Sequence, residues 1–506
     1  MTVAHTERRC VSHRVLVGLE IHVQLATLSK MFTGVANASG ALRADEAPPE
    51  PNTAVDPQIL GLPGTLPVMN KKAVEFSIKA GLALGCKIAS FTKWDRKSYY
   101  YPDLPKNYQI SQYDLPLCYE GSFELAMGDE TKTIRIRRAH LEEDAGKLLH
   151  EAPGGYHIDW SIVDLNRAGT PLLEIVTEPD FDSPKSVSLF AQELQKLVQY
   201  LGVSQGQMQL GQMRFEPNIN VHITDASGAV HKTAITEIKN LNSFSVLERA
   251  VAYEVRRQIE QWETTGDLGR KSTYGWDEPT ESTFHQRDKE DAHDYRYFPD
   301  PDLMPVEVGE AWLSEIKGQI GELPAARKLR YINAMKLSPV DATTIASDRL
   351  LGDYYDQTIA CGADAKRSAN LIINVLAKIS NNLKRPVYAL GVHATRLADV
   401  AKLIDANKIG ASNALPLFER LVSADAPGAD VSTETIATDL GLIQVSDTGP
   451  IDAAIDAMIA ENPKSLQDYI GGKASALGSL TGMVMKQGKG FNPKLVQERL
   501  KAKLGQ

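Results

Sequence analysis

The chain has 506 residues, of which 43% are hydrophobic and 24% charged, and its net charge is −9. This length exceeds what one hydrophobic core supports, so we expect two to four domains. The four cysteines lack paired spacing, which excludes a disulfide framework and a cysteine-rich zinc site and indicates a reducing compartment. Neither a signal peptide nor a run of about 18 apolar residues is present, so a cytoplasmic protein is expected.

Four strand-like segments in the first half of the chain carry acidic residues on one face. In residues 18–25, apolar residues alternate with polar ones, which puts Glu20 and His22 on the same face. Three later segments follow a similar plan: residues 140–144 with Glu142 and Glu143, residues 171–176 with Glu174, and residues 216–223, where Glu216, Asn218, Asn220 and His222 share a face.

Together these segments indicate a metal site. Oxygen ligands with at most one imidazole suit a hard cation such as Mg²⁺ or Mn²⁺ better than zinc. Each segment taken singly also has a plainer interpretation. A Glu-x-His pair is common on a solvated strand, and Glu142-Glu143-Asp144 is typical of a charged surface turn. The pattern alone leaves both interpretations open.

Helical patterns are few before Pro305 and dominate after it. Ser183-Pro184 predicts the start of a helix that runs to residue 200, and a second helix is predicted over about 245–262. Further helices are predicted over 338–359 and 368–379, and amphipathic helices from about residue 431, with turns at residues 471–473 and 488–490. We therefore expect an α+β fold of three domains: an antiparallel-sheet catalytic cradle over 1–305, an all-helical domain over 306–430 and a helical tail over 431–506.

The tail is basic. Between residues 462 and 506, eight Lys and Arg residues stand against two acidic ones, which leaves −15 for the remainder of the chain. A basic tail on an acidic body suits a polyanion that is held at one end while its other end reaches an active site. A solvated helix face explains the same charges.

The sequence contains no phosphate-binding loop. The segment around Gly146-Lys147 lacks both the earlier glycine and the following Ser or Thr of a Walker motif, and no Gly-x-Gly-x-x-Gly follows a strand. Any nucleotide would therefore be held by metal-bridged carboxylates and basic side chains, on an antiparallel sheet of the glutamine-synthetase-like kind. The candidate phosphate contacts, each also explicable as an ordinary surface side chain, are Lys147, Arg167, Arg214, Lys239 and Asn218.

Long motifs in this chain resemble, in order, the B subunits of tRNA-dependent amidotransferases, the GatB/GatE family. The resemblance covers essentially the whole chain, including a YqeY-like tail. It rests on residues 17–23, 61–70, 100–106, 108–112, 140–147, 164–167, 169–180, 237–244, 294–299, 301–302, 480–486 and 489–490.

This resemblance implies a glutamine-dependent amidotransferase subunit that amidates glutamate or aspartate mischarged onto the tRNA for glutamine or asparagine. ATP and Mg²⁺ (or Mn²⁺) would serve to phosphorylate the side-chain carboxylate, and ammonia would displace the phosphate. No amidase-like Gly/Ser-rich signature is present, so the ammonia would come from an A subunit, with a small C subunit completing a heterotrimer. No membrane partner is implied.

The family's functional positions can be transferred residue by residue. The metal positions fall on Glu20, His22, Glu143, Glu174 and Glu216, and Glu216 replaces the family's aspartate. The candidate catalytic residues are Glu20, His22, Glu142, Glu143 and Glu174. Independently of the family positions, the basic tail makes Lys486, Lys489 and Lys494 candidates for tRNA binding.

Two further expectations concern local segments. No structural zinc is expected, because Thr33, Val35, Asp56 and Ile59 occupy the positions of the zinc ligands of some relatives. Residues 294–302 are a candidate for the wall of an ammonia channel or for contact with the tRNA acceptor end, and a buried hairpin is the alternative.

Two other functions remain open. A free-standing ATP-dependent carboxylate-amine ligase would use the same sheet on a small molecule, and a non-catalytic adaptor would bind tRNA through the tail alone. Binding of mischarged tRNA separates the amidotransferase from the ligase, and loss of ATP turnover in Glu20→Gln or Glu143→Gln separates it from the adaptor.

Overall fold

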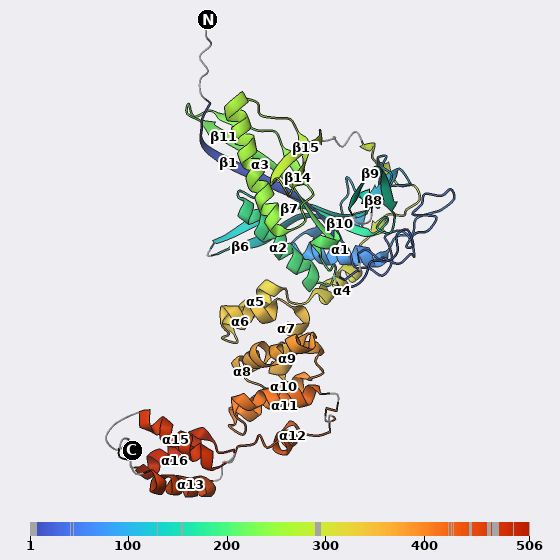
Figure 1. Ribbon diagram of the computed structural model, residues 1–506. Coiled ribbons are helices and arrows are strands. Elements are labelled where there is room, and N and C mark those ends of the chain that lie inside the picture. The colour runs from blue at the N-terminus through green and yellow to red at the C-terminus, as the bar shows by residue number, and fades with distance from the viewer. Residues whose placement is uncertain are drawn as a thin grey trace. The chain divides into compact units, whose positions relative to one another are not determined.

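The computed structural model describes residues 8–40, 42–43, 45–128, 130–152, 155–288, 295–423, 425–426, 428, 430–444, 448–462, 467, 475–488 and 490–504. The chain divides into two compact units, Met1–Leu323 and Pro324–Gln506. The first is built on a large sheet and the second is helical (Figure 1), which confirms the predicted α+β fold. In the described part of the chain, no helix is long and apolar enough to cross a membrane.

The first unit contains a 10-stranded sheet in the order β15-β14-β13-β11-β1-β10-β7-β6-β2, with β12 beside β11. Its neighbouring strands are antiparallel except for β13 and β14, which are parallel. The strands are β1 (Cys10–Gln24), β2 (Lys87–Ile88), β6 (Cys118–Met127), β7 (Glu130–Glu143), β10 (Pro171–Thr177), β11 (Met213–Asp225), β12 (Val230–Lys232), β13 (Thr236–Lys239), β14 (Ser272–Asp277) and β15 (Ser282–Asp288).

One face of this sheet is apolar and covered by helices. On β1, Val17, Leu19 and Ile21 are fully buried and alternate with less buried residues. The helices α2 (Pro184–Tyr200) and α3 (Phe244–Thr265) lie over this face (Figure 1), and α1 (Lys71–Ala83) packs against β6 and β7. Both predicted helices are thus confirmed, and the opposite, polar face of the sheet is left for chemistry.

Three short sheets complete the first unit. They pair β16 (Phe298–Pro299) with β4 (Asp95–Ser98) and β4 with β5 (Tyr108–Ser111), β17 (Val306–Glu307) with β3 (Phe91–Thr92), and β8 (Lys147–Ala152) with β9 (Tyr156–Asp164). The first unit continues past residue 305, because β17 pairs with β3 and Trp312 of α4 (Glu310–Ile320) donates to Glu75 of α1 at 3.3 Å. A 3₁₀ turn, η1 (Met208–Leu210), precedes β11.

The described part of the second unit consists of helices and their connections, with one isolated antiparallel bridge between Ile409 and Ile443. The predicted helix over 338–359 is two helices, because Asp348 accepts a hydrogen bond from Leu351 N at 3.0 Å and starts a new one. The predicted helix over 368–379 is confirmed, with a π-helical turn (Leu371–Leu376) inside it. The helices are α5 (Pro324–Asn333), α6 (Pro339–Ala346), α7 (Arg349–Ala360), α8 (Ala365–Asn370), α9 (Ala377–Leu383), α10 (Ala394–Asp405), α11 (Ala414–Val422), α12 (Thr433–Asp439), α13 (Thr448–Glu461), α15 (Ser475–Gln487) and α16 (Pro493–Leu504), with 3₁₀ turns at Val387–Ala389 and Ala411–Asn413.

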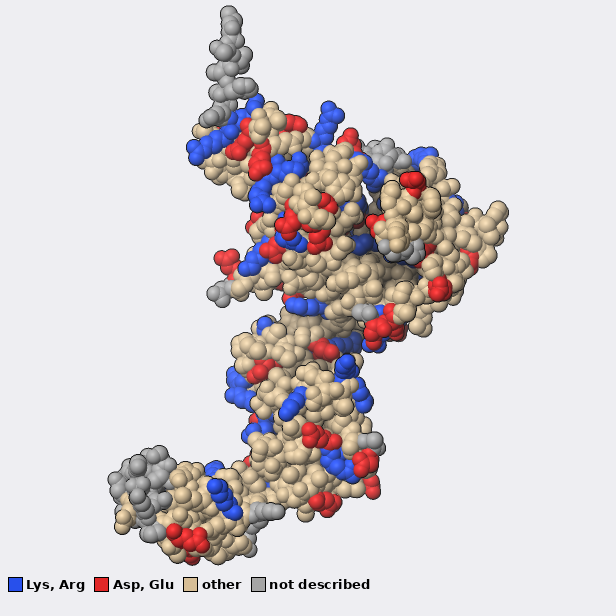
Figure 2. Space-filling model, viewed as in Figure 1, with Lys and Arg blue, Asp and Glu red and all other residues tan. Residues whose placement is uncertain are grey.

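Two separate hydrophobic clusters stabilise this unit. One extends from Tyr331 to Ala437 and so includes α12, and the other extends from Ile451 to Leu500. The predicted turn at residues 471–473 lies outside the described residues, as does Lys489 of the second turn. On the face seen in Figure 2, Lys and Arg side chains are interspersed with Asp and Glu and do not gather in one field.

Candidate functional site

Four glutamates and one histidine meet on the polar face of the main sheet. Glu20 and His22 project from β1, Glu216 from β11, Glu174 from β10 and Glu142 from β7. The strand register brings them together, since Glu20 pairs with Glu216 and His22 pairs with Glu174. Two overlapping groups, Glu20-His22-Glu216 and His22-Glu142-Glu174, can each place their ligand atoms within 4.8 Å of one another. We call these five residues the acidic cluster.

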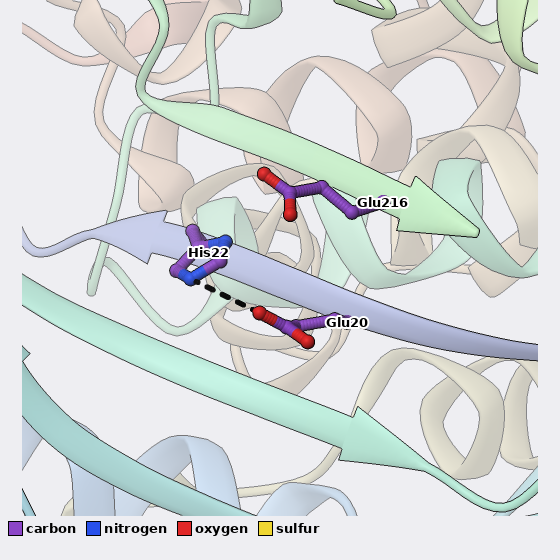
Figure 3. Close-up of side chains that lie close together, drawn as sticks. All are labelled: Glu20, His22 and Glu216. Carbon is purple, nitrogen blue, oxygen red and sulfur yellow. Dashed lines mark ion pairs between the residues drawn. The ribbon is translucent and has the colours of Figure 1, made fainter. Parts of the chain in front are cut away.

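His22 lies at the centre of the acidic cluster. Its Nε2 is 3.6 Å from Glu142 Oε1, 3.6 Å from Glu174 Oε2 and 3.9 Å from Glu20 Oε1. Figure 3 shows Glu20 and His22 on one strand, pointing toward Glu216 on the next. Burial opposes charge on His22, but the close approach of Glu174 and the charges of Glu216 and Glu142 raise its pKa to about 9.

The acidic cluster holds more negative charge than its surroundings stabilise. Burial and the neighbouring Glu174 raise the pKa of Glu20 to about 7, and the same two causes raise the pKa of Glu142 to about 7. Near neutral pH the cluster therefore binds either protons or an added cation. Carboxylate oxygens with one imidazole form a donor set that suits Mg²⁺ or Mn²⁺, so these residues fit the predicted metal.

Glu143 does not belong to this cluster. Consecutive residues of a strand point to opposite faces, so Glu143 leaves β7 on the side away from Glu142. Its carboxylate forms an ion pair with Lys106 and accepts a hydrogen bond from Ile110 N at 3.0 Å. The position predicted for a metal ligand is thus held by a buried ion pair, and Glu142 contributes the carboxylate that faces His22.

A cavity of about 490 Å³ opens over the acidic cluster. Its wall includes Lys97 of β4, whose pKa is raised by Tyr297, Glu142 and Glu174 although burial opposes its charge. Arg138 of β7 lies on the same wall, with Nη2 at 3.8 Å from Glu174 Oε1. Neither cation was predicted from the sequence. Arg138 stands four residues before Glu142 and so on the same face of β7, whereas nothing in the short strand β4 distinguishes Lys97 from a surface residue.

His140, for which the sequence predicted no role, also lines this cavity. Its Nε2 is 3.6 Å from Glu174 Oε2, and burial lowers its pKa to about 4. Its position two residues before Glu142 puts it on the same face of β7, a signal that strand alternation could have provided.

Tyrosines form much of the remaining wall. Tyr113 and Tyr297 stack with ring centroids 4.2 Å apart, and the other three are Tyr99, Tyr101 and Tyr295. Tyr295 and Tyr297 come from the segment 294–302, whose first residue, Asp294, lies outside the described residues. This segment reaches the cavity because β16 pairs with β4 and because Arg96 Nε donates to Asp300 at 2.7 Å. Its aromatic residues therefore face the site.

A second cavity, of about 640 Å³, shares Arg214, Glu216 and Lys239 with the first. Of the predicted phosphate contacts, Arg214 and Lys239 thus lie between the two cavities, Lys147 and Arg167 line the second cavity only, and Asn218 lines neither. Lys239 Nζ is 2.5 Å from Glu216 Oε2, which together with other nearby cations lowers the pKa of Glu216 to about 2 although burial opposes this.

Asp144 fixes Arg214 at this boundary. Arg214 Nη2 lies 3.1 Å from each oxygen of Asp144, which also accepts from Gln24 Nε2 at 2.7 Å. Burial would raise the pKa of Asp144, but Arg214 and Arg167 lower it to about 2. The ionised form of Asp144 is therefore favoured, and it anchors Arg214 on the basic side of the site.

The predicted tail residues lie on two helices. Lys486 of α15 and Lys494 of α16 are exposed, and Lys489 lies outside the described residues. Two other basic residues of the tail are used internally, since Arg499 pairs with Asp452, and Lys503 lies 2.5 Å from Asp456. The charge that the tail presents is thus smaller than its composition indicates.

Side-chain hydrogen bonds occupy the segment where some relatives bind zinc. Thr33 Oγ1 donates to Asp56, and Asp56 Oδ1 accepts from Ile59 N at 2.9 Å. The absence of a structural zinc stays a prediction. The four cysteines are all free.

Comparisons with known proteins find two family models and several named proteins that match this chain. A model of the GatB/GatE catalytic domain matches residues 15–314, and a model of the GatB domain matches residues 353–504. Proteins that are named as the B subunit of aspartyl/glutamyl-tRNA(Asn/Gln) amidotransferase are similar over nearly their full length. The one from Carboxydothermus hydrogenoformans is 42% identical over 97% of this chain and 99% of its own, the one from Caldanaerobacter subterraneus 41% identical over 98% and 100%, and the one from Thermodesulfovibrio yellowstonii 40% identical over 96% and 98%.

Proposed function

The chain belongs to the GatB/GatE family, and on that premise we propose that it is the subunit of a glutamine-dependent amidotransferase that acts on mischarged tRNA. Its substrate would be Glu-tRNA(Gln), Asp-tRNA(Asn) or both, and the products Gln-tRNA(Gln) and Asn-tRNA(Asn). The observation that carries the proposal is the acidic cluster, in which four carboxylates from four strands surround one imidazole.

The acidic cluster would hold the divalent metal. We assign Glu20, His22, Glu142, Glu174 and Glu216 to this role, with Glu142 in place of Glu143. Bound Mg²⁺ would neutralise charge on the transferring phosphoryl group. Glu216 is suited to this although the family has aspartate here, since its carboxylate already reaches the group of Glu20 and His22.

Basic side chains at the boundary of the two cavities would bind the phosphates of ATP. Arg214 and Lys239 lie there, held by Asp144 and Glu216, and Lys147 and Arg167 extend the basic lining into the second cavity. Lys97 and Arg138 face the acidic cluster from the other wall. The two sets of cations would offset the negative charge that a phosphoryl group brings next to the substrate carboxylate.

The tyrosine-lined wall suits the terminal nucleoside of an aminoacylated tRNA, because bases and riboses stack on aromatic faces. Tyr101 and Tyr113 are exposed and accessible to such a group. In the reaction, a side-chain carboxylate oxygen takes the γ-phosphoryl group of ATP, and ADP leaves. Ammonia then attacks the acyl carbon, phosphate leaves with the C–O bonding pair, and one proton is lost from nitrogen.

We assign the supply of ammonia to a partner A subunit with glutaminase activity, and include a small C subunit in a heterotrimer. This assignment rests on the family and on the lack of an amidase signature in this sequence. The tail would bind tRNA through Lys486, Lys494 and Lys489. A cytoplasmic location stays a prediction.

The test is an amidation assay with ATP, Mg²⁺ and free ammonia, carried out with the chain alone and with its A and C partners. We expect amidated aminoacyl-tRNA only when a mischarged tRNA is present. Amidation of free amino acids would support the small-molecule ligase, and tRNA binding without ATP turnover would support the adaptor.

A further inference from the structure

A row of three basic side chains crosses the polar face of the main sheet beyond the acidic cluster. Arg14 of β1 pairs in register with His222 of β11, and His222 pairs with Lys232 of β12. All three lie on the same face as Glu20 and Glu216. Arg14 stands six positions before Glu20 on β1, and His222 stands six positions after Glu216 on β11. Lys232 pairs directly with His222 and so shares its face. We call Arg14, His222 and Lys232 the basic row.

The basic row has no anionic partner among the described residues. Arg14 and Lys232 are exposed, and His222 is partly buried between them. None of the three forms an ion pair with a residue that the structure describes. Burial lowers the pKa of His222, and the charges of Lys232 and Arg14 lower it further. The nearby Asp225 is engaged by His231 Nε2 at 2.8 Å. Arg14 and Lys232 thus stand on either side of His222 without a carboxylate beside them, and an anionic ligand would supply the counter-charge.

The distance from the acidic cluster limits what that anion can be. His222 stands six positions after Glu216, and at about 3.3 Å per position the basic row lies roughly 20 Å along β11 from the cluster. The phosphates of ATP must meet the substrate carboxylate at the cluster, so they cannot also occupy the basic row. A polyanion whose reactive end lies at the cluster has further phosphates at such a distance.

The face between the two ends is compatible with an RNA strand. Register pairs lead from Glu20 and Glu216 through Gly18 with Asn218 and Leu16 with Asn220 to the basic row. The four residues between the acidic cluster and the basic row are uncharged. Of these, Asn220 carries an amide that can hydrogen-bond to sugar or phosphate oxygens.

We propose that Arg14, His222 and Lys232 bind the phosphodiester backbone of the tRNA acceptor arm and so position the aminoacyl end at the acidic cluster. This inference rests on the proposed function, since it takes the aminoacyl-tRNA as the substrate. The basic row is a binding and positioning surface, distinct from the tail and from the predicted phosphate contacts of ATP.

The test is the double variant Arg14→Glu/Lys232→Glu in the complex with the A and C partners. We expect the KM for mischarged tRNA to rise about tenfold or more, with kcat at saturating tRNA and the KM for ATP unchanged. Binding of deacylated tRNA should weaken, and the slope of log K against log salt should fall by roughly 1–2, as expected for the loss of two phosphate contacts.

The matched control is Lys185→Glu/Arg256→Glu. These exposed residues lie on α2 and α3, which cover the opposite face of the sheet, and the double variant makes the same change in net charge. If both double variants change the KM for tRNA equally, the basic row has no special role and the inference fails. A raised KM for ATP or dissociation of the heterotrimer, measured by size-exclusion chromatography, would assign the row to ATP or to a protein partner and overturn it.

Two further arms keep the test decisive. If Arg14→Glu/Lys232→Glu unfolds the first unit, Arg14→Gln/Lys232→Gln replaces it, with a smaller expected loss of tRNA affinity. If the wild-type complex amidates no tRNA, the proposed function has failed, and the RNA-binding comparison with Lys185→Glu/Arg256→Glu still decides whether the basic row binds RNA. Equal RNA affinities of the two double variants would refute it.

Discussion

Replacing Glu142 by Gln removes a carboxylate from the acidic cluster, with its 3.6 Å contact to His22, and leaves the ion pair of Glu143 with Lys106 in place. In the metal-free protein, burial and Glu174 raise the pKa of Glu142 from 4.5 to about 7. The raised pKa means that folding disfavours the ionised form. This penalty is absent below pH 4.5 and grows as the pH rises toward 7. Above pH 7 it reaches about 3 kcal/mol, because each unit of pKa difference is worth about 1.4 kcal/mol.

Without metal, Glu142→Gln should therefore be more stable than the wild type by up to about 3 kcal/mol at pH 8 and no different at pH 4.5. Glu143→Gln should have the opposite effect. It leaves the buried Lys106 ammonium without its carboxylate, which typically costs about 3–5 kcal/mol.

Denaturant unfolding followed by tryptophan fluorescence measures this difference. All five tryptophans lie in Met1–Leu323, so the signal reports the first unit alone. Titration with Mn²⁺ supplies the second readout. We expect the affinity for Mn²⁺ to fall more than about tenfold below that of the wild type in Glu142→Gln, and less than about threefold in folded Glu143→Gln. The opposite order of metal affinities would refute the reasoning from strand alternation and restore Glu143 as the ligand.

The remaining predictions concern other parts of the chain. Asp144→Asn should lower the free energy of unfolding of the first unit by about 3–5 kcal/mol, since it leaves Arg214 without its buried partner, and unchanged tryptophan-detected unfolding would contradict this. Lys486→Glu/Lys494→Glu should weaken tRNA binding and flatten its salt dependence, and unchanged affinity would remove the tail from the account. Lys30→Met should lower the free energy of unfolding of the first unit by about 2–4 kcal/mol, because the Lys30 ammonium donates to the backbone oxygens of Ala54 and Ala168 at 2.6 and 2.7 Å. Elemental analysis of the wild type should find no stoichiometric zinc, and finding it would refute the expectation drawn from Thr33 and Asp56.

Alternation along strands explains what the sequence could predict of the site. Glu20, His22 and Glu216 stand in clearly alternating segments, so their common face follows from the pattern alone. Glu174 lies in a strand whose two faces are both buried, so alternation does not show which way it points. Its place beside His22 depends on the register between β1 and β10. The same parity applied to β7 would have separated Glu142 from Glu143, but the run of adjacent acidic residues gives no indication of which one faces the cluster.

The rest of the site depends on pairings between distant segments. Lys97 reaches the cavity because β4, only four residues long, pairs with β5 and β16, and the latter lies about 200 residues further along the chain. Tyr295 and Tyr297 arrive by the same pairing. The break between α6 and α7 depends on the cap formed by Asp348, which competes locally with a helical pattern that continues on both sides.

We propose that this chain phosphorylates the side-chain carboxylate of an aminoacyl-tRNA at the acidic cluster. The most direct test of this proposal incubates the complex with mischarged tRNA, ATP, Mg²⁺ and hydroxylamine, with ammonia and glutamine left out, in wild type and Glu142→Gln. We predict that the wild type forms a side-chain hydroxamate (γ-glutamyl or β-aspartyl) on the tRNA together with ADP and phosphate, and that Glu142→Gln does not. ATP hydrolysis without hydroxamate, or equal hydroxamate formation in Glu142→Gln, would contradict the claim.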